Sequence, residues 1–512
     1  MKSRNKIYIT SAILLLLGNL LFLLTVWLLN KYDAINLDQI LYQLKTSAAG
    51  ANKNLLGSAY VRVGGFGILL TVAEILIYRL LSGLTKKFYK NEKYKKYTAS
   101  ACCSWFKKTA LPVALAMVIF AVSFFVLKLN IVPYLSTTTT ESDFIKENYI
   151  APNEDKITFP EKKRNLIYIF LESMENTYMD TENGGVNSNN YIAELTALAR
   201  DNVSFSNTEK LGGAYSFTGA TWTAAAMVSQ TSGINVKVPL NAENYGGENS
   251  FIPGIVSLGE VLEKQGYNQT LLIGSDSEFA GRDSYFSQHG NYNIIDIKKL
   301  KEEGRLPEDY VVWWGYEDKK LFDYAKEELG KLAESNEPFN FTMLTADTHF
   351  PNGYYCEACE EIYDTQYANV LACSSRKVAE FIEWLKEQPY YDNTTIILSG
   401  DHLTMDPDFL KDIDQTYTRT IYNCFINSAV NPIKEQNRQF GVFDMFPTTL
   451  SAMGVRIKGD RLGIGTDLFS ASKTLTEIHG YETLNTELQK KSEFYNTNFL
   501  QMDNKKEKAS GG

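Results

Sequence analysis

The chain has 512 residues, a formal net charge of −9 and a high content of aromatic residues, with 31 Tyr and 28 Phe. Its charge is unevenly divided: residues 1–133 hold 17 Lys/Arg against 4 Asp/Glu, whereas the remainder holds 34 against 56. An acidic globular part offers no basic surface for DNA or RNA, so nucleic acid is excluded as its expected partner.

Three apolar runs in the basic part are long enough to cross a lipid bilayer, which takes about 20 residues. We therefore predict a transmembrane region over residues 1–133, with spans at about residues 7–29, 60–81 and 109–127. The first run is too long for the apolar core of a signal peptide, and no small-residue cleavage site follows it. We expect it to remain as a membrane helix.

The distribution of basic residues predicts how these spans cross the membrane. Residues 86–96, between the second and third spans, are rich in Lys, and three basic residues precede the first span. Because basic loops stay in the cytoplasm, we expect a multi-pass protein of the cell membrane with a cytoplasmic N-terminus and everything after Pro133 outside. Between the first two spans, residues 37–44 have helical apolar spacing, which fits a helix on the outer membrane surface or one that caps the bundle.

The rest of the chain is predicted to form a linker, a globular domain and a tail. The expected boundaries are 134–163 for the polar linker, 164–470 for the domain, and 471–512 for a C-terminal helix and a disordered tail. Strand patterns in the domain alternate with helix patterns. The strands are expected at 165–171, 269–274, 339–346, 394–400 and 420–426, and the helices at 258–266, 319–329, 377–386 and 443–453. This alternation predicts a doubly wound α/β sandwich.

Candidate chemistry lies where three of these strands end. Glu172 follows the first strand, His349 lies just beyond the third, and Asp401 and His402 follow the fourth. The carboxyl ends of the strands are where open α/β sheets bind ligands. Carboxylate and imidazole side chains together offer oxygen and nitrogen ligands to a divalent metal. Taken alone, Asp401-His402 also fits a turn without function, but the matching end of the first strand favours a site.

A loop rich in Gly, Ser and Thr, beginning at Gly212, leads into an Ala-rich helix that ends near Gly233. A Thr at the start of this helix is either a plain N-cap or a hydroxyl placed where a helix N-terminus favours phosphate. A Thr hydroxyl becomes a nucleophile only when a base or a metal lowers its pKa. A divalent ion held by Glu172, Asp401 and His402 would supply that activation, with the Thr oxygen as fourth ligand.

Six cysteines are present, and four of them lie in the acidic part: Cys356, Cys359, Cys373 and Cys424. Cys356 and Cys359 have the spacing of a zinc knuckle, but no second such pair or paired His follows, so the sequence argues against metal there. In an extracellular domain we expect a disulfide from Cys356 or Cys359 to Cys373, with the pairing left open.

These motifs resemble those of the alkaline phosphatase/sulfatase superfamily. More narrowly, they resemble the membrane phosphoglycerol transferases, a family with lipoteichoic acid synthases and the enzyme that decorates periplasmic glucans. The resemblance covers about residues 160–470. It depends on the order and spacing of segments 165–180, 223–233, 278–283, 314–318, 347–351, 399–402 and 444–449. It implies that the extracellular α/β sandwich is a sulfatase-like catalytic domain.

The resemblance also implies roles for single residues. Glu172, Asp401 and His402 would be metal ligands. Thr223, ten residues before Gly233, would be the nucleophile and a further ligand, with Thr221 as the alternative. Two carboxylates and one imidazole favour Mn²⁺, with Mg²⁺ or Zn²⁺ as alternatives.

Three further residues are expected to bind the substrate. Arg282 and His349 would contact the phosphoryl and glycerol groups, Arg282 through its bidentate fork, and His349 would also protonate the leaving oxygen. His289 is a third candidate, for which a structural role is equally open.

The implied reaction is a two-step transfer from phosphatidylglycerol. Thr223 attacks the phosphodiester, diacylglycerol leaves, and a hydroxyl of lipoteichoic acid, a polysaccharide or a glycolipid accepts the glycerol phosphate. Two departures put the acceptor in question: the resembled synthases have five spans, and they carry a Trp where this chain has Ala280.

Other functions remain open from the sequence. A phosphoethanolamine transferase or a metal-dependent phosphodiesterase or sulfatase-like hydrolase would use the same ligands. A true sulfatase would need the C/S-x-P-S-R signature, which residues 223–227 lack. An inactive relative that binds a cell-surface glycan is the alternative from another class.

Overall fold

The computed structural model describes residues 2–32, 35, 37–46, 53–88, 99–239, 245–247, 250–335, 337–411, 413–414 and 416–501. The chain divides into two compact units. The first consists of Met1–Ile35 and Asn52–Ser136, and the second of Asn36–Ala51 and Thr137–Gly512. The predicted basic loop at 86–96 lies mostly outside the described residues, and the predicted disordered tail lies outside them almost entirely.

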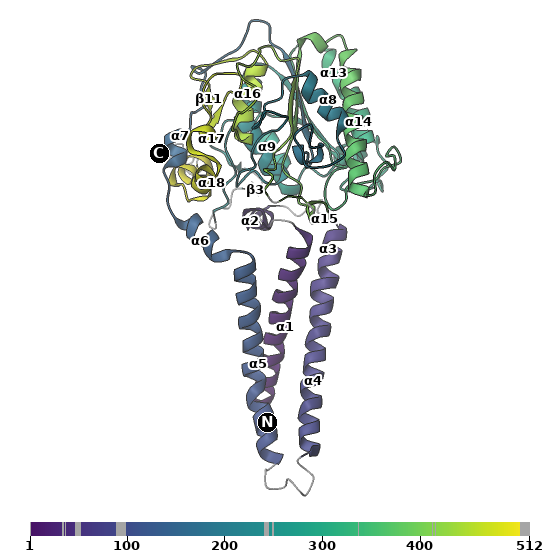
Figure 1. The fold of residues 1–512 in the computed structure, drawn as a ribbon, viewed down its shortest axis with the longest axis vertical. Coiled ribbons are helices and arrows are strands. Elements are labelled where there is room, and N and C mark those ends of the chain that lie inside the picture. The colour runs from purple at the N-terminus through teal and green to yellow at the C-terminus, as the bar shows by residue number, and fades with distance from the viewer. Residues whose placement is uncertain are drawn as a thin grey trace. The chain divides into compact units, whose positions relative to one another are not determined.

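The first unit is built from long apolar helices (Figure 1). They are α1 (Lys2–Lys31), α3 (Lys53–Ala59) continuing through a π-helical turn (Tyr60–Gly65) into α4 (Phe66–Phe88), and α5 (Ala99–Lys128). Three stretches are long and apolar enough to cross a membrane: Lys6–Lys31, Leu56–Leu81 and Lys108–Lys128. The three spans predicted from the sequence are therefore confirmed as helices. Inside this unit the Asn19 amide donates to Thr71 and to Glu74, which satisfies polar groups among apolar neighbours.

The second unit is organised on a six-stranded sheet with the order β6-β5-β7-β2-β8-β9. The strands are β2 (Asn165–Leu171), β5 (Asn268–Ile273), β6 (Asn293–Ile295), β7 (Phe339–Leu344), β8 (Thr394–Gly400) and β9 (Asn423–Ile426). All neighbours are parallel except β8 and β9. Every residue of β2 and β8 is buried, as expected for strands covered on both faces.

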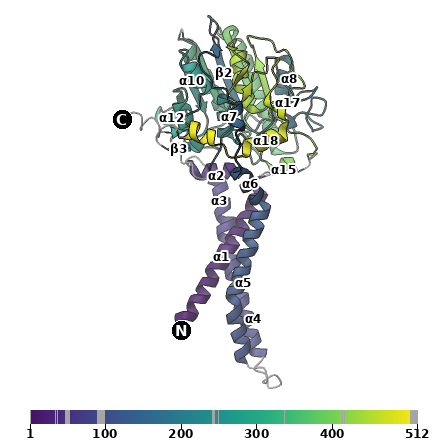
Figure 2. The ribbon, with the colours of Figure 1, turned by 90° about the vertical axis from the view of Figure 1, so that its left-hand side faces the viewer.

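Helices cover both faces of this sheet. Ile167, Ile169 and Leu171 of β2 point into a core shared with α8 (Ala193–Asp201), α13 (Asp318–Ala333) and α14 (Gln366–Lys386). On the other face, Tyr168 donates its hydroxyl to Gln230 of α9 (Thr223–Ser232). Figure 2 shows β2 between α10 (Leu258–Glu263) and α8. The predicted doubly wound α/β sandwich is confirmed.

The predicted and observed elements differ most at α14, which begins at Gln366 although the sequence pattern suggests 377. Its first half carries buried polar residues that interrupt the apolar stripe. Asn369 accepts hydrogen bonds from two backbone N–H groups of the preceding loop, and Ser375 donates to Glu194. These tertiary contacts replace the apolar periodicity on which the prediction depended.

The segment predicted as a linker contains regular structure. It includes the end of α6 (Ile131–Thr139), then α7 (Phe144–Asn148) and β1 (Ile157–Thr158), which pairs with β10 (Arg456–Ile457). Residues 137–163 thus belong to the second unit. The C-terminal part of the second unit forms α17 (Leu475–His479), α18 (Tyr481–Gln489) and α19 (Glu493–Tyr495).

Helix α2 (Leu37–Lys45) also belongs to the second unit, although it lies in the chain between two candidate spans. Its Tyr42 is fully buried and donates a 2.6 Å hydrogen bond to the Ala280 carbonyl. The Tyr42 ring packs against Trp222 and Phe251, at centroid distances of 5.2 and 6.5 Å. The helical apolar spacing of residues 37–44 predicted the helix, but it did not predict that Tyr42 packs into the second unit.

Candidate active site

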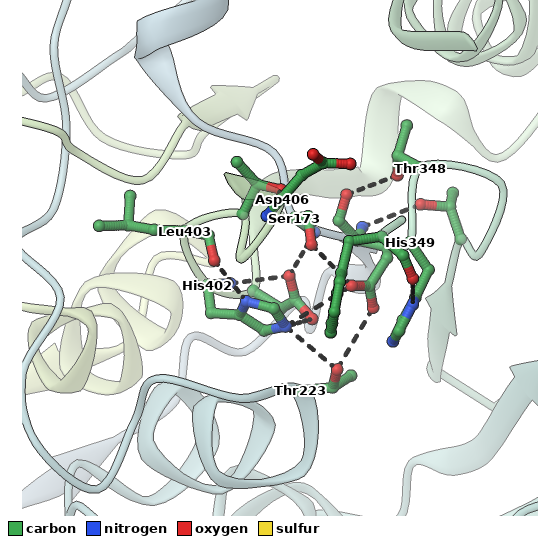
Figure 3. Close-up of polar contacts among 12 residues, drawn as sticks. Ser173, Thr223, Thr348, His349, His402, Leu403 and Asp406 are labelled. Carbon is green, nitrogen blue, oxygen red and sulfur yellow. Dashed lines mark hydrogen bonds and ion pairs between the residues drawn. The ribbon is translucent and has the colours of Figure 1, made fainter. Parts of the chain in front are cut away.

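The predicted strand ends meet at one edge of the sheet (Figure 3). Glu172 follows β2, and Asp401 and His402 follow β8, which is hydrogen-bonded to β2 along its whole length. A ligand atom from each of these three buried residues lies within 4.8 Å of the other two. His402 Nε2 is 3.5 Å from Glu172 Oε1 and 3.5 Å from Asp401 Oδ2.

The orientation of the His402 ring is fixed by its second ring nitrogen. Nδ1 lies 2.8 Å from the Leu403 carbonyl, which can only accept, so Nδ1 carries a proton. Nε2 then faces the two carboxylates and Thr223. Histidines that bind metals donate their other N–H to a carbonyl or a carboxylate in the same way.

Asp401 is held for ligation by its first oxygen. Oδ1 accepts hydrogen bonds of 2.7 Å from the backbone N–H groups of Ser173 and His402. Oδ2 is buried and accepts no hydrogen bond within the part of the chain that the structure describes. A buried acceptor without a donor is costly unless a cation satisfies it.

Thr223 completes the group from the start of α9 (Figure 3). Its Oγ1 is 3.3 Å from Glu172 Oε2 and 3.3 Å from His402 Nε2. One hydroxyl hydrogen cannot satisfy both of these acceptors and Asp401 Oδ2 as well. These four residues therefore offer more hydrogen-bond acceptors than donors. A divalent cation bound among them would satisfy the acceptors that are left.

The pKa values reflect the same crowding of charge. Burial, and then the neighbouring Glu172, raise the pKa of Asp401 to about 7. Burial alone lowers the pKa of His402, but Asp401 and Glu172 outweigh it, so the pKa of His402 is raised. Both groups take up protons readily without a cation, and a bound cation would replace those protons.

The backbone around the site is held by residues that the sequence motifs did not indicate. Thr345 accepts from the backbone N–H of Glu172, and Thr348 donates to the Glu172 carbonyl. Gln230 of α9 donates to the Gly400 carbonyl at the end of β8, which fixes the helix to the strand. Local sequence patterns could not have indicated these contacts, because each contact joins residues far apart in the chain.

His349 is half-buried beside the site. Its ring lies 4.3 Å from that of Trp314, and its Nδ1 donates to the Phe350 carbonyl. Burial lowers its pKa to about 4, so the ring is neutral near pH 7 with Nε2 as a proton acceptor. This state suits a base better than the acid that the resemblance implied.

Arg282 begins α11 (Arg282–Gln288) and is buried. Its Nη2 donates to Ser275 Oγ and to the Asp276 carbonyl, and its Nε donates to the Phe279 carbonyl. Burial lowers its pKa, while the charge of Glu172 is the largest influence in the opposite direction. Three hydrogen bonds therefore hold the guanidinium in a place where it feels the charge of Glu172, one of the candidate metal ligands.

His289 is engaged elsewhere. Its Nδ1 is 3.0 Å from Glu260 Oε2 and its Nε2 is 2.8 Å from the Phe251 carbonyl. Both ring nitrogens bond to protein atoms, so the structure supports the structural alternative for this residue.

The expected disulfide is not formed in the structure, where the cysteines at 356, 359, 373 and 424 are free thiols. Cys424 lies on β9, and its Sγ donates to the Leu198 carbonyl. The other three gather in one cluster.

The fold and the site together define a class of protein, an α/β sandwich in which a helix-terminal hydroxyl lies among candidate metal ligands. Residues 164–455 match the sulfatase family. The chain belongs to this family, within the alkaline phosphatase superfamily.

The chain is also similar to individual proteins. Phosphoglycerol transferase I of Salmonella choleraesuis (strain SC-B67) is 30% identical over 329 residues, which are 63% of this chain and 41% of that protein. The chain therefore aligns with about two fifths of the length of this curated relative. The lipoteichoic acid synthase LtaP from Listeria monocytogenes superposes with a TM-score of 0.49 and 20% identity, over 64% of this chain and 80% of that one. The lipooligosaccharide phosphoethanolamine transferase A from Neisseria meningitidis superposes with a TM-score of 0.49 and 14% identity, over 88% of this chain and 84% of that one.

Proposed function

We propose that this protein is a membrane-bound transferase that moves glycerol phosphate from phosphatidylglycerol to a cell-envelope acceptor. The observation that carries the proposal is the position of the Thr223 hydroxyl, 3.3 Å from both Glu172 Oε2 and His402 Nε2. The choice of donor is supported by the relative named phosphoglycerol transferase I.

Glu172, Thr223, Asp401 and His402 would hold a divalent cation, and Mn²⁺ suits their oxygen-rich set. When bound, the cation lowers the pKa of the hydroxyl and stabilises negative charge on the phosphoryl oxygens. In the first step, Thr223 Oγ1 attacks phosphorus and gives up its proton, for which Glu172 Oε2 is placed as acceptor. The diacylglycerol oxygen takes up this proton as its bond to phosphorus breaks, and a glycerophosphoryl group remains on Thr223.

The second step uses an acceptor hydroxyl in place of Thr223. Neutral His349 offers Nε2 to accept the proton of that hydroxyl, while the contact of its Nδ1 with Phe350 keeps the ring in place. Arg282, fixed by three hydrogen bonds, would oppose the charge of the phosphoryl group.

A cleft beside His402 is a candidate site for the acceptor. It has a volume of about 580 Å³. One of its lining residues is Leu403, whose carbonyl accepts a hydrogen bond from the His402 ring. Its lining residues are polar and aromatic: Tyr215, Ser216, Leu403, Tyr417, Thr418, Arg419, Gly480, Tyr481, Glu482 and Thr483. The Tyr215 and Tyr481 rings stack at 5.2 Å. Flat apolar faces among hydrogen-bonding groups suit a glycan or a glycolipid headgroup.

A lipid donor is consistent with the organisation of the chain. The second unit includes α2, a segment that lies in the sequence between the first two candidate spans. We propose that the second unit lies outside the cell, as the basic residues near the spans suggest.

Trapping of the intermediate tests this proposal. The full-length protein in detergent with Mn²⁺ is exposed to phosphatidylglycerol, quenched in acid and digested. Peptide mass spectrometry is expected to find a glycerophosphoryl group on Thr223, and also in a Thr221→Ala variant. An adduct formed only from phosphatidylethanolamine would assign the protein to the phosphoethanolamine transferases, and an adduct on Thr221 would move the nucleophile by two residues.

A further inference from the structure

A second cluster of metal-binding side chains lies outside the phosphoryl-transfer site. Cys356 and Cys359 are in the loop between β7 and α14, and Cys373 is on α14 itself. The three Sγ atoms all lie within 4.8 Å of one another, and all three residues are buried. The proposed transfer reaction makes no use of them.

The spacing of the sulfur atoms matches that of ligands around one tetrahedral ion. A Zn–S bond of about 2.3 Å places neighbouring sulfurs about 3.8 Å apart. Cys356 Sγ and Cys359 Sγ are 3.6 Å apart, and the backbone N–H of Cys359 donates to the Cys356 carbonyl, which closes a turn between them. A disulfide would join two of the three cysteines and leave a buried odd thiol, whereas a metal engages all three.

The charge around the cluster also fits a metal–thiolate group. Three thiolates and one Zn²⁺ carry a net charge of −1. The buried Lys377 ammonium lies 3.1 Å from Cys356 Sγ and 2.9 Å from Asp347 Oδ2. It can donate to a thiolate as well as to the Asp347 carboxylate, and its positive charge offsets part of the negative charge of these two groups. No fourth Cys, His, Asp or Glu joins the group among the described residues, so a water would complete the tetrahedron.

We propose that Cys356, Cys359 and Cys373 form a structural zinc site, separate from the ion proposed for catalysis. Soft thiolates select Zn²⁺ over Mn²⁺ and Mg²⁺. Thiolates also select Cu⁺ and the iron of iron–sulfur centres, and elemental analysis in the experiment below distinguishes these from zinc.

The site has a structural consequence for His349. The loop that it ties to α14 contains His349, and Lys377 connects Cys356 of the cluster to Asp347. Asp347 in turn accepts from the backbone N–H of Asp318, at the start of α13. The zinc site thus fixes the loop that positions His349.

Elemental analysis and X-ray absorption at the zinc edge test this directly. The full-length protein, purified with no added metal and without chelator, is expected to hold zinc with sulfur neighbours at about 2.3 Å. This signal is expected to be lost in Cys373→Ser and kept in Cys424→Ser, a matched change at a cysteine outside the cluster. It is also expected to remain in Glu172→Gln, which separates it from the catalytic ion.

A second measurement covers the case in which Cys373→Ser fails to fold. An organic mercurial added to the wild-type protein is expected to release one zinc per chain to a colorimetric indicator. Copper in place of zinc would overturn the assignment of the ion. A thiol count in denaturant that falls two short of the six cysteines until reductant is added would overturn the site. Neither result depends on phosphatidylglycerol activity, so the zinc site and the proposed function fail independently.

Discussion

The two buried clusters of candidate metal ligands are opposite in chemical character. Glu172, Asp401 and His402 offer hard oxygen and imidazole ligands, with the Thr223 hydroxyl among them. The cysteine cluster offers soft sulfur and has a lysine in contact with it. The first also has an unsatisfied acceptor, Asp401 Oδ2, and a hydroxyl that can act as a nucleophile.

This difference shows how the two proposed metal sites of one domain would each select a different ion. Ligand type selects the ion, so Mn²⁺ or Mg²⁺ is retained by oxygen and Zn²⁺ by thiolate. The oxygen cluster joins strands at the ligand-binding edge of the sheet, where a substrate can enter. The sulfur cluster joins a loop to a helix, where a metal can only stabilise.

The largest expected effect is that of Asp401→Asn. The change removes a charged ligand and should lower transferase activity on the order of a thousandfold, with a matching loss of bound Mn²⁺. Sulfur-bound zinc should be unchanged. Diacylglycerol release and elemental analysis on the same sample measure both, and a parallel loss of zinc would show that the clusters are not independent.

His349→Gln should act on the rate alone. Loss of a general base costs about 10²–10⁴-fold in kcat, while Mn²⁺ and zinc contents stay at wild-type values. His289→Gln is the matched control, because both ring nitrogens of His289 form hydrogen bonds away from the site, with Glu260 and Phe251. It should lower the free energy of unfolding by about 1–3 kcal/mol and leave kcat unchanged. Equal rate losses in both variants would contradict the roles assigned to the two histidines.

The affinity for Mn²⁺ should depend on pH. The raised pKa of Asp401, about 7, means that its carboxyl is protonated below pH 7, and an incoming ion must displace that proton. Apparent affinity should therefore fall as the pH drops below 7, by about tenfold per unit for the Asp401 proton, and more steeply where His402, whose pKa is also raised, takes up a second proton. Isothermal titration with Mn²⁺ from pH 5 to 8 measures this, and a flat profile would contradict the cation–proton competition.

The smallest effect is expected from Tyr42→Phe. The ring keeps its contacts with Trp222 and Phe251, but the Ala280 carbonyl loses a hydrogen bond. Stability should fall by roughly 0.5–1.5 kcal/mol. Thermal unfolding of the full-length protein measures the change, with Tyr42→Ala as a larger perturbation of the same contact. No difference between the two variants would show that the packing of α2 contributes little.

Features that lie on single strands were predictable from the sequence. The bounds of β2 and β8 and the residues at their ends follow from apolar runs that stop at polar groups. The parallel sheet then brings Glu172 to Asp401 and His402, because carboxyl ends meet at one edge. The C-cap of α9 at Gly233, where φ is +68°, was likewise marked by a glycine.

Features that depend on contacts between distant segments were not predictable. The early start of α14 is hidden by polar residues with tertiary partners, such as Asn369. The approach of Cys373 to Cys356 and Cys359 depends on the path of a loop, so the sequence favoured a disulfide over a metal. The burial of Tyr42 beside Ala280 likewise joins segments more than 200 residues apart.

The most direct test of the central claim is release of diacylglycerol from fluorescent phosphatidylglycerol by the full-length protein. We predict release that requires Mn²⁺, stops with chelator, returns when Mn²⁺ is restored, and is absent in Thr223→Ala but present in Thr221→Ala. A folded, Mn²⁺-loaded protein that releases no diacylglycerol from this lipid, or a Thr223→Ala variant that releases it at the wild-type rate, would contradict the proposed function.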